Sequence, residues 1–160
     1  MRFHSLPESK RYAVTEEEYA TLLKRQHAIL ADLGAAQELI AITCEWSADP
    51  SPRRREPDLE RVAPGEHWRT VLENETEEPE ARTYTHLYVG PLTNLPATFD
   101  PLLREVADFE TAGVIIAPRG LGWLVHPYDG GVDVMTATRA ERDALRSRHL
   151  EWLSQHQGGL

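Results

Sequence analysis

The spacing of apolar residues along the chain predicts three helices. Apolar side chains recur at helical spacing after Thr15–Glu18, a pattern in which the threonine and the last glutamate cap a helix start. Gly34 follows the last apolar position and suits a helix end, so we expect the first helix over 16–33. Asp100-Pro101 is typical of a second helix start. Thr138–Glu141 repeats the capping pattern and opens the last helix.

Shorter apolar or alternating segments predict the strands. They cover residues 39–46, 68–72, 83–89, 114–117, 123–127 and 132–136. Most of the connections between them are short, which favours antiparallel pairing. The predicted order is therefore αβββαβββα. The fold class is α+β, with a mostly antiparallel sheet of about five to six strands and helices packed on one face.

The remaining segments predict an arm and a long loop within a single domain over 1–160. A chain of 160 residues fits one domain. Residues 1–14 form an N-terminal arm. Residues 47–66 contain four prolines and no repeating apolar face, so they form a long surface loop, which is either functional or disordered. Within it, Arg53–Arg55 is a local binding patch or a solvated run that neighbouring carboxylates compensate.

The segment Trp123–Met135 is the most distinctive part of the chain. Asp129-Gly130 is a strong signal for a hairpin turn between two strands. Pairing across that turn places His126 opposite Asp133. Tyr128 lies on the same face of the sheet, while the tryptophan and valines of the hairpin lie on the face toward the helices.

A facing histidine and aspartate can serve either chemistry or structure. The carboxylate of Asp133 would orient the ring of His126 as a general base, and Tyr128 would add a donor. Alternatively, the pair only holds an exposed sheet face, and Asp129 fixes the turn through its own backbone. Further candidates for a convergent or ligand-binding site are His4 and Lys10 on the arm, His86 on another strand, and Asp129.

Composition and charge narrow the classes of partner. The chain has 17 basic and 26 acidic residues, a formal net charge of -9, which disfavours nucleic acid. The charge fits a basic protein partner, or solubility alone. The single cysteine, Cys44, excludes an intrachain disulfide and lies in an apolar run, so we expect a buried thiol. No apolar run has the length of a membrane span and no signal peptide is recognisable, so the cytoplasm is the expected location.

Short catalytic motifs do not occur in the sequence. It has no P-loop, no dinucleotide-binding glycine pattern, no nucleophile elbow and no paired-cysteine motif. The seven histidines do not fall at the local spacings of a metal site. We therefore expect neither a metal nor a cofactor.

Several segments together resemble a bacterial family, domain-of-unknown-function family 3885. The resemblance covers most of the chain outside residues 47–82, and its opening and middle segments look like the actinobacterial branch. The residues that carry it are Arg2–Tyr12, Asp100–Asp108, His126–Val134 and Trp152. Because the family has no established activity, the resemblance implies a domain and no mechanism.

Two hypotheses from different classes follow. The first is a non-catalytic protein-binding or regulatory module, similar in kind to immunity or inhibitor proteins, which are often small, acidic and α+β. The alternative is a small hydrolase or acid–base enzyme that uses His126, Asp133 and Tyr128. The sequence leaves the oligomeric state and the identity of partner or substrate open.

Overall fold

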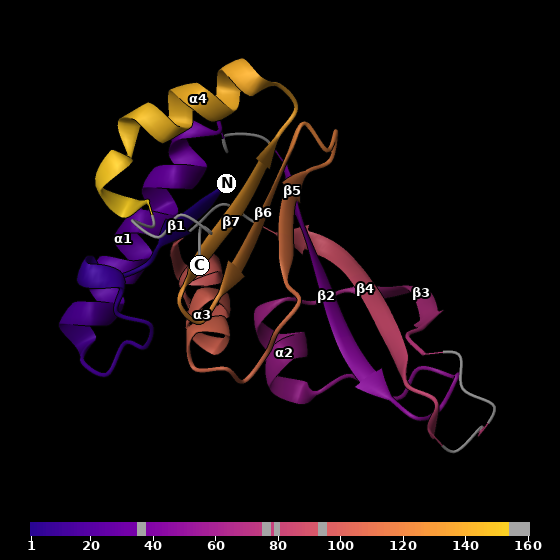
Figure 1. The fold of residues 1–160 in the computed structure, drawn as a ribbon. Coiled ribbons are helices and arrows are strands. Elements are labelled where there is room, and N and C mark those ends of the chain that lie inside the picture. The colour runs from indigo at the N-terminus through magenta and orange to yellow at the C-terminus, as the bar shows by residue number, and fades with distance from the viewer. Residues whose placement is uncertain (35–37, 75–77, 79–80, 93–95, 154–160) are drawn as a thin grey trace.

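One open antiparallel sheet organises the described part of the chain. The computed structural model describes residues 1–34, 38–74, 78, 81–92 and 96–153. Its strands lie in the order β1-β7-β6-β5-β2-β4-β3 (Figure 1). They are β1 (Arg2–His4), β2 (Leu39–Ser47), β3 (Glu66–Leu72), β4 (Tyr84–Leu92), β5 (Ile115–Pro118), β6 (Trp123–Tyr128) and β7 (Gly131–Thr136). The expected α+β class and antiparallel pairing are confirmed, with seven strands in place of five to six.

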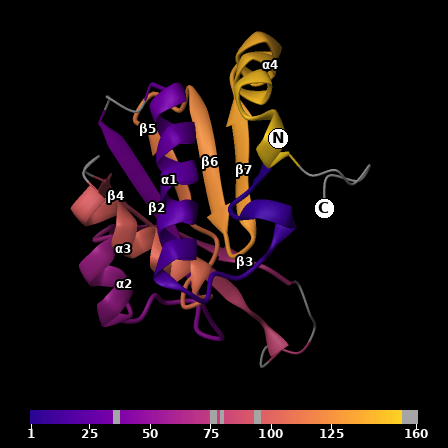
Figure 2. The same ribbon diagram turned by 90° about the vertical axis from the view of Figure 1, so that its left-hand side faces the viewer.

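Helices pack on one face of this sheet, as the sequence predicts. They are α1 (Glu16–Asp32), α2 (Pro57–Val62), α3 (Pro96–Ala107) and α4 (Arg139–Arg148), with 3-10 turns over Pro7–Ser9 and Leu150–Trp152. Figure 2 shows α1, α2 and α3 in front of the sheet and α4 beside β7. The core lies between the two layers, and each large apolar side chain buried there contributes about 1.5–3 kcal/mol. Its largest members include Phe3, Leu22, Ile29, Leu30, Phe99, Leu102 and Ile116.

The two faces of the hairpin divide as period-two alternation requires. Trp123, Val125 and Val134 are buried on the side of the helices. His126 and Met135 lie on the opposite face, which the described helices leave uncovered. The expected register and the expected orientation of the apolar side are both confirmed.

The N-terminal arm begins with a strand that sequence reasoning did not predict. β1 pairs antiparallel with β7, and Phe3, opposite Val132, is fully buried. Gly131 permits this close approach, because a Cβ atom there would lie 2.3 Å from the carbonyl oxygen of Phe3. Three residues are too few to show strand periodicity, which explains why the strand was missed.

The segment 47–66 is also more ordered than a surface loop. It contains α2, whose Leu59 is buried against the core. The expectation that its arginines form a solvated run is wrong for Arg55, which is only 8% exposed, whereas the expected compensation by a neighbouring carboxylate is found in its ion pair with Glu60. The Arg55 guanidinium donates to Thr43 Oγ1 at 2.8 Å and to the Ala63 carbonyl at 2.9 Å. These backbone and hydroxyl partners become available only when the chain folds back on β2.

The helix ends were predicted with mixed success. Thr15 caps α1 and Thr138 forms a full capping box on α4, as expected. The predicted start of the second helix at Asp100 is wrong, because α3 begins at Pro96. Asp100 instead lies inside α3 and bonds His27 of α1, with 2.6 Å between Oδ1 and Nε2. Among the described residues, no helix has the length and hydrophobicity that crossing a membrane requires.

Candidate functional site

The hairpin holds its predicted register, but its acid has a different partner. His126 lies opposite Asp133, as expected. Asp133 accepts two hydrogen bonds from Arg2 of β1, Nε to Oδ1 at 2.9 Å and Nη2 to Oδ2 at 2.9 Å. Within the described part of the chain, His126 makes no hydrogen bond to this carboxylate. The proposed orientation of His126 by Asp133 is therefore not formed, because β1 supplies an arginine that the hairpin alone does not reveal.

The pKa shifts around Tyr128 also disfavour acid–base catalysis by the hairpin. The hydrogen bonds from Arg2 hold the pKa of Asp133 below its usual range, despite partial burial. Burial raises the pKa of Tyr128, so its phenol stays protonated at neutral pH. Burial, with a smaller contribution from nearby Arg25 and Arg2, lowers the pKa of His4.

The structure brings His4 and Tyr128 together in a hollow of about 360 Å³. Arg2 and Arg11 also line it, and both arginines already pair with carboxylates of the hairpin. Asp129, a predicted binding residue, is one of those carboxylates: it is buried and accepts from Arg11 Nε at 2.8 Å. The charges of this hollow are thus compensated from within.

His86 lies far from the hairpin, and the hypothesis that the histidines converge is wrong. Ile116 pairs with both Ala41 and Val125, so these residues share the face covered by the helices. His86 lies in that same layer, whereas His126, next to Val125, points to the other face. Three strand spacings, about 14 Å, also separate β6 from β4.

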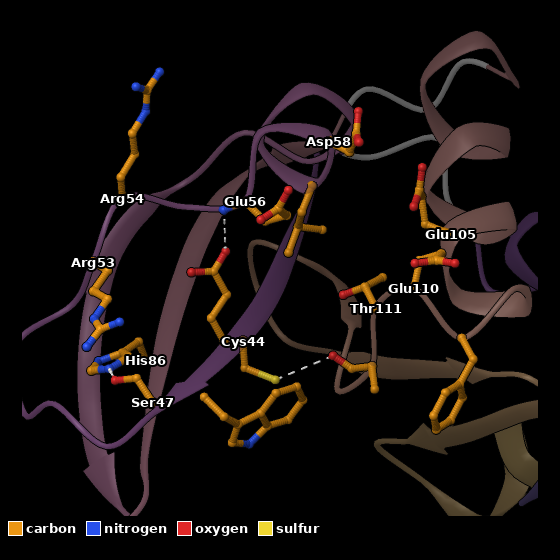
Figure 3. Close-up of a pocket in the computed structure, with 15 residues that line it drawn as sticks. Cys44, Ser47, Arg53, Arg54, Glu56, Asp58, His86, Glu105, Glu110 and Thr111 are labelled. Atoms are coloured by element: carbon orange, nitrogen blue, oxygen red, sulfur yellow. Dashed lines mark hydrogen bonds between the residues drawn. The ribbon is translucent and has the colours of Figure 1, made fainter.

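A larger cavity of about 770 Å³ lies beside the end of β2 and reaches His86 of β4. It is larger than the hollow beside His4 and Tyr128, which measures about 360 Å³. The walls of the larger cavity come from the end of β2, from the segment that leads into α2, and from the end of α3 with the residues after it (Figure 3). Lining residues include Cys44, Glu45, Trp46, Ser47, Arg53, Arg54, Glu56, Asp58, His86, Glu105, Phe109 and Glu110.

One side of this cavity carries carboxylates. Figure 3 shows Glu105 and Glu110 across the cavity from Arg53 and His86. The side chains of Glu105 and Glu110 make no hydrogen bond or ion pair with other described residues. Glu56 adds a further carboxylate between the two sides of the cavity. Unpaired carboxylates on one wall create a negative potential that favours a cation.

Two exposed aromatic rings also line the cavity. Trp46 is 52% exposed and Phe109 is 71% exposed. Phe109 adopts a φ of 64°, in the left-handed region that favours glycine. Its amide donates to the Val106 carbonyl and the Glu110 amide to the Glu105 carbonyl, the pattern of a helix end that usually has glycine at this position. A bulky ring kept there without burial is not explained by the stability of the fold.

The opposite side of the cavity holds a hydrogen-bonded serine and histidine. Ser47 Oγ lies 2.8 Å from His86 Nε2, and Thr70 Oγ1 lies 2.9 Å from His86 Nδ1. His86 is 2% exposed, and these two hydrogen bonds together with its burial fix the orientation of the ring. Sequence reasoning missed Ser47 because its proximity to His86 depends on the pairing of β2 with β4, which sequence spacing does not reveal.

Metal ligation finds no support among the described residues, where no group of three or more His, Cys, Asp or Glu side chains is suitably placed. Cys44 is a free, buried thiol, as expected. Burial raises the pKa of Cys44 to about 11, with smaller contributions from Glu73 and Glu45. It is therefore a poor metal ligand and a poor nucleophile at neutral pH.

Comparison with known proteins gives a family and no activity. A family model described as a domain of unknown function (DUF3885) matches residues 1–157. No curated protein and no solved structure matches the chain. The chemistry of the cavity is consequently the basis for assigning a function.

Proposed function

The chain belongs to the DUF3885 family, and we propose that it is a protein-binding module whose cavity receives a basic side chain of a partner protein. The observation that carries this proposal is the lining of the cavity, which combines the carboxylates of Glu105 and Glu110 with the exposed rings of Trp46 and Phe109. An ammonium or guanidinium group placed there meets carboxylates and aromatic faces together. Both kinds of group attract cations.

The remaining charge of the molecule supports the same kind of partner. The formal net charge of -9 steers a basic surface toward the protein and raises its rate of association at low salt. The volume of about 770 Å³ exceeds what one lysine or arginine side chain fills, which leaves room for the adjoining backbone of a partner segment. A basic protein segment therefore fits better than a small inorganic cation.

A titration followed by NMR tests this proposal. The probe is a short peptide containing lysine and arginine, and the control peptide has glutamine at the same positions. We expect saturable shifts of the Trp46 indole signal, assigned with Trp46→Phe, for the basic peptide alone. Glu105→Gln combined with Glu110→Gln should weaken binding by about tenfold or more, because the cation loses both carboxylates.

The matched control for charge is Glu17→Gln combined with Glu66→Gln. These two exposed glutamates lie outside the cavity, and their replacement changes the net charge by the same amount. If this control weakens binding as much as the cavity variant, the peptide responds to overall charge and the proposed site is wrong. Absence of saturable binding to the wild-type protein overturns the proposal outright.

The cellular setting is a proposal of the same kind. We infer the cytoplasm of a bacterium, and the actinobacterial branch of the family. The cytoplasm fits a chain with one free cysteine. The branch rests on the opening segment Arg2–Tyr12 and on Asp100–Asp108. Cells that express a tagged form of the protein can be fractionated to test the location. We expect the tagged protein in the cytosolic fraction.

A further inference from the structure

The side of the cavity opposite the carboxylates has the components of a nucleophile and its base. Ser47 is partly exposed and lines the cavity, so its oxygen is within reach of a bound molecule. His86 Nε2 lies 2.8 Å from that oxygen. This distance is within the range over which a general base takes a hydroxyl proton.

Hydrogen bonds around the pair are compatible with one reactive arrangement. Thr70 Oγ1, 2.9 Å from His86 Nδ1, can accept the Nδ1 proton, which leaves Nε2 free to accept from Ser47. In that arrangement the Thr70 hydroxyl donates its own proton to His67 Nε2, 3.0 Å away. The amide of Asp49 donates to Ser47 Oγ at 3.2 Å, which stabilises negative charge that develops on the oxygen. The Asp49 carbonyl, 2.9 Å away, is a competing acceptor for the same hydroxyl proton. The tautomer of His86 therefore decides whether Ser47 is activated.

We propose that Ser47 is a nucleophile and His86 its general base, and that the cavity hydrolyses carboxylic esters whose acyl part carries a cationic side chain. The cationic preference rests on the proposed binding of a basic group by Glu105 and Glu110. The reactivity of Ser47 does not depend on it. Arg53 lies on the same side as His86 in Figure 3, and its positive charge would stabilise the negative charge that develops on the carbonyl oxygen.

The reaction needs no further reactant than water. Ser47 Oγ bonds to the carbonyl carbon, the π electrons move to the carbonyl oxygen, and the Ser47 proton moves to His86 Nε2. The carbonyl double bond then re-forms, the bond from carbon to the alcohol oxygen breaks with its electron pair on that oxygen, and His86 returns its proton to it. Water attacks the acyl–Ser47 ester in the same way and releases the carboxylic acid, which restores the Ser47 hydroxyl.

Covalent labelling tests the nucleophile without any assumption about the cation. Wild-type protein is incubated with an alkyl fluorophosphonate, and the mass of the intact protein and of its peptides is measured. We expect one adduct on Ser47, no adduct in Ser47→Ala, and an unchanged adduct in Ser51→Ala, which replaces a serine of the segment after β2 that does not line the cavity. An unlabelled wild-type protein, or equal labelling of Ser47→Ala, overturns the proposal.

The tautomer of His86 gives a second test, which does not depend on the folding of a variant. Nitrogen-15 chemical shifts of the wild-type imidazole distinguish a proton on Nδ1 from a proton on Nε2. We expect the proton on Nδ1, bonded to Thr70. A neutral ring with its proton on Nε2 means that His86 donates to Ser47, and it overturns the proposal.

Ester kinetics separate this inference from the proposed binding function. Arginine methyl ester and norleucine methyl ester are compared by kcat/KM. A preference of about tenfold or more for the arginine ester is expected. It should disappear when Glu105→Gln is combined with Glu110→Gln, while Ser47 is still labelled. If Ser47 is labelled and no preference exists, the nucleophile stands and the cationic site is wrong. If basic peptides bind and Ser47 is never labelled, the cationic site stands and the proposed nucleophile is wrong.

Discussion

Arg2 and Asp133 form a bidentate ion pair that connects β1 to β7. The two side chains face each other across β1 and β7, and each oxygen of Asp133 accepts from a different nitrogen of Arg2 at 2.9 Å. Both side chains are about one-third exposed, at 32% and 34%. Solvent therefore screens part of the attraction, while the fixed geometry retains part of it.

The pair predicts an acid-sensitive share of the stability. In the folded protein the pKa of Asp133 is lowered by Arg2, so the folded state binds the proton more weakly than the unfolded chain. The stabilisation is thus present above the ordinary carboxyl pKa of about 4 and is lost as pH falls through the lower, folded value. Asp133→Asn should reduce the free energy of unfolding by about 1 kcal/mol at neutral pH, and the difference from wild type should shrink below about pH 4.

Urea unfolding at neutral and acidic pH measures this effect. The control is Asp143→Asn, which removes a carboxylate of an exposed pair between sequence neighbours on α4. That variant should change the free energy of unfolding by no more than a few tenths of a kcal/mol. A loss for Asp133→Asn that is equally large at acidic pH would assign its effect to packing rather than to the ion pair.

A second prediction concerns Phe109. Its left-handed backbone conformation lowers the stability of the fold, whereas its exposed ring contributes to the proposed binding of a cation. Phe109→Gly should raise the free energy of unfolding by about 0.5–1 kcal/mol, because glycine adopts this conformation without strain and little buried surface is lost. The same variant should weaken the binding of the basic peptide. Thermal unfolding and the peptide titration measure the two effects.

Gly34 supplies the matched control for this conformational effect. It follows α1 with a φ of 73°, and a Cβ atom there would meet nothing within 4 Å. Gly34→Ala should therefore lower the free energy of unfolding by about 1 kcal/mol through backbone strain alone. If Phe109→Gly destabilises the protein, the ring makes contacts that its exposure does not suggest.

A third prediction concerns Gly131, where β1 crosses close to the hairpin. A methyl group there would lie 2.3 Å from the Phe3 carbonyl oxygen and 2.7 Å from the Tyr128 hydroxyl, and the first of these is backbone. Gly131→Ala should lower the free energy of unfolding by about 2 kcal/mol or more and displace β1. Faster hydrogen exchange at the Val134 amide, which donates to the Met1 carbonyl, would report that displacement.

Gly122→Ala is the control, because a Cβ atom at Gly122 would meet nothing within 4 Å and its φ is not in the left-handed region. It should leave the free energy of unfolding within about 0.5 kcal/mol of wild type. Equal destabilisation by the two substitutions would contradict a role for close approach at Gly131.

Local patterns were sufficient to predict the hairpin and most of the elements. The facing of His126 and Asp133 follows from two strands and one turn, and the structure has that register. The caps at Thr15 and Thr138 are likewise decided within four residues of sequence. Such features are predictable because the interacting groups are close along the chain.

The candidate site was not predictable, because its groups meet only through long-range pairing. Ser47 and His86 lie 39 residues apart and come together through the register of β2 with β4. Arg2 reaches Asp133 across 131 residues and thereby takes the acid that the hairpin pattern assigned to His126. Chemistry was expected where the local pattern was clearest, whereas the cavity forms where distant segments meet.

The last prediction concerns the thiol of Cys44, which lies at the edge of the cavity without taking part in the proposed chemistry. Its sulfur lies 3.4 Å from the Ala112 carbonyl oxygen, and burial raises its pKa to about 11. A thiol with that pKa is almost wholly protonated at about pH 8, and the thiolate is the reactive form.

Native protein should therefore react with Ellman's reagent about 100-fold or more slowly than a free cysteine, and urea-denatured protein should react at the ordinary rate. Because the pKa is raised above the ordinary value, the rate in native protein should also keep rising with pH beyond the range where a free cysteine levels off. Rapid modification of the native protein near neutral pH would show that the end of β2 opens to solvent, and the fixed position of the neighbouring Ser47 would then be in question.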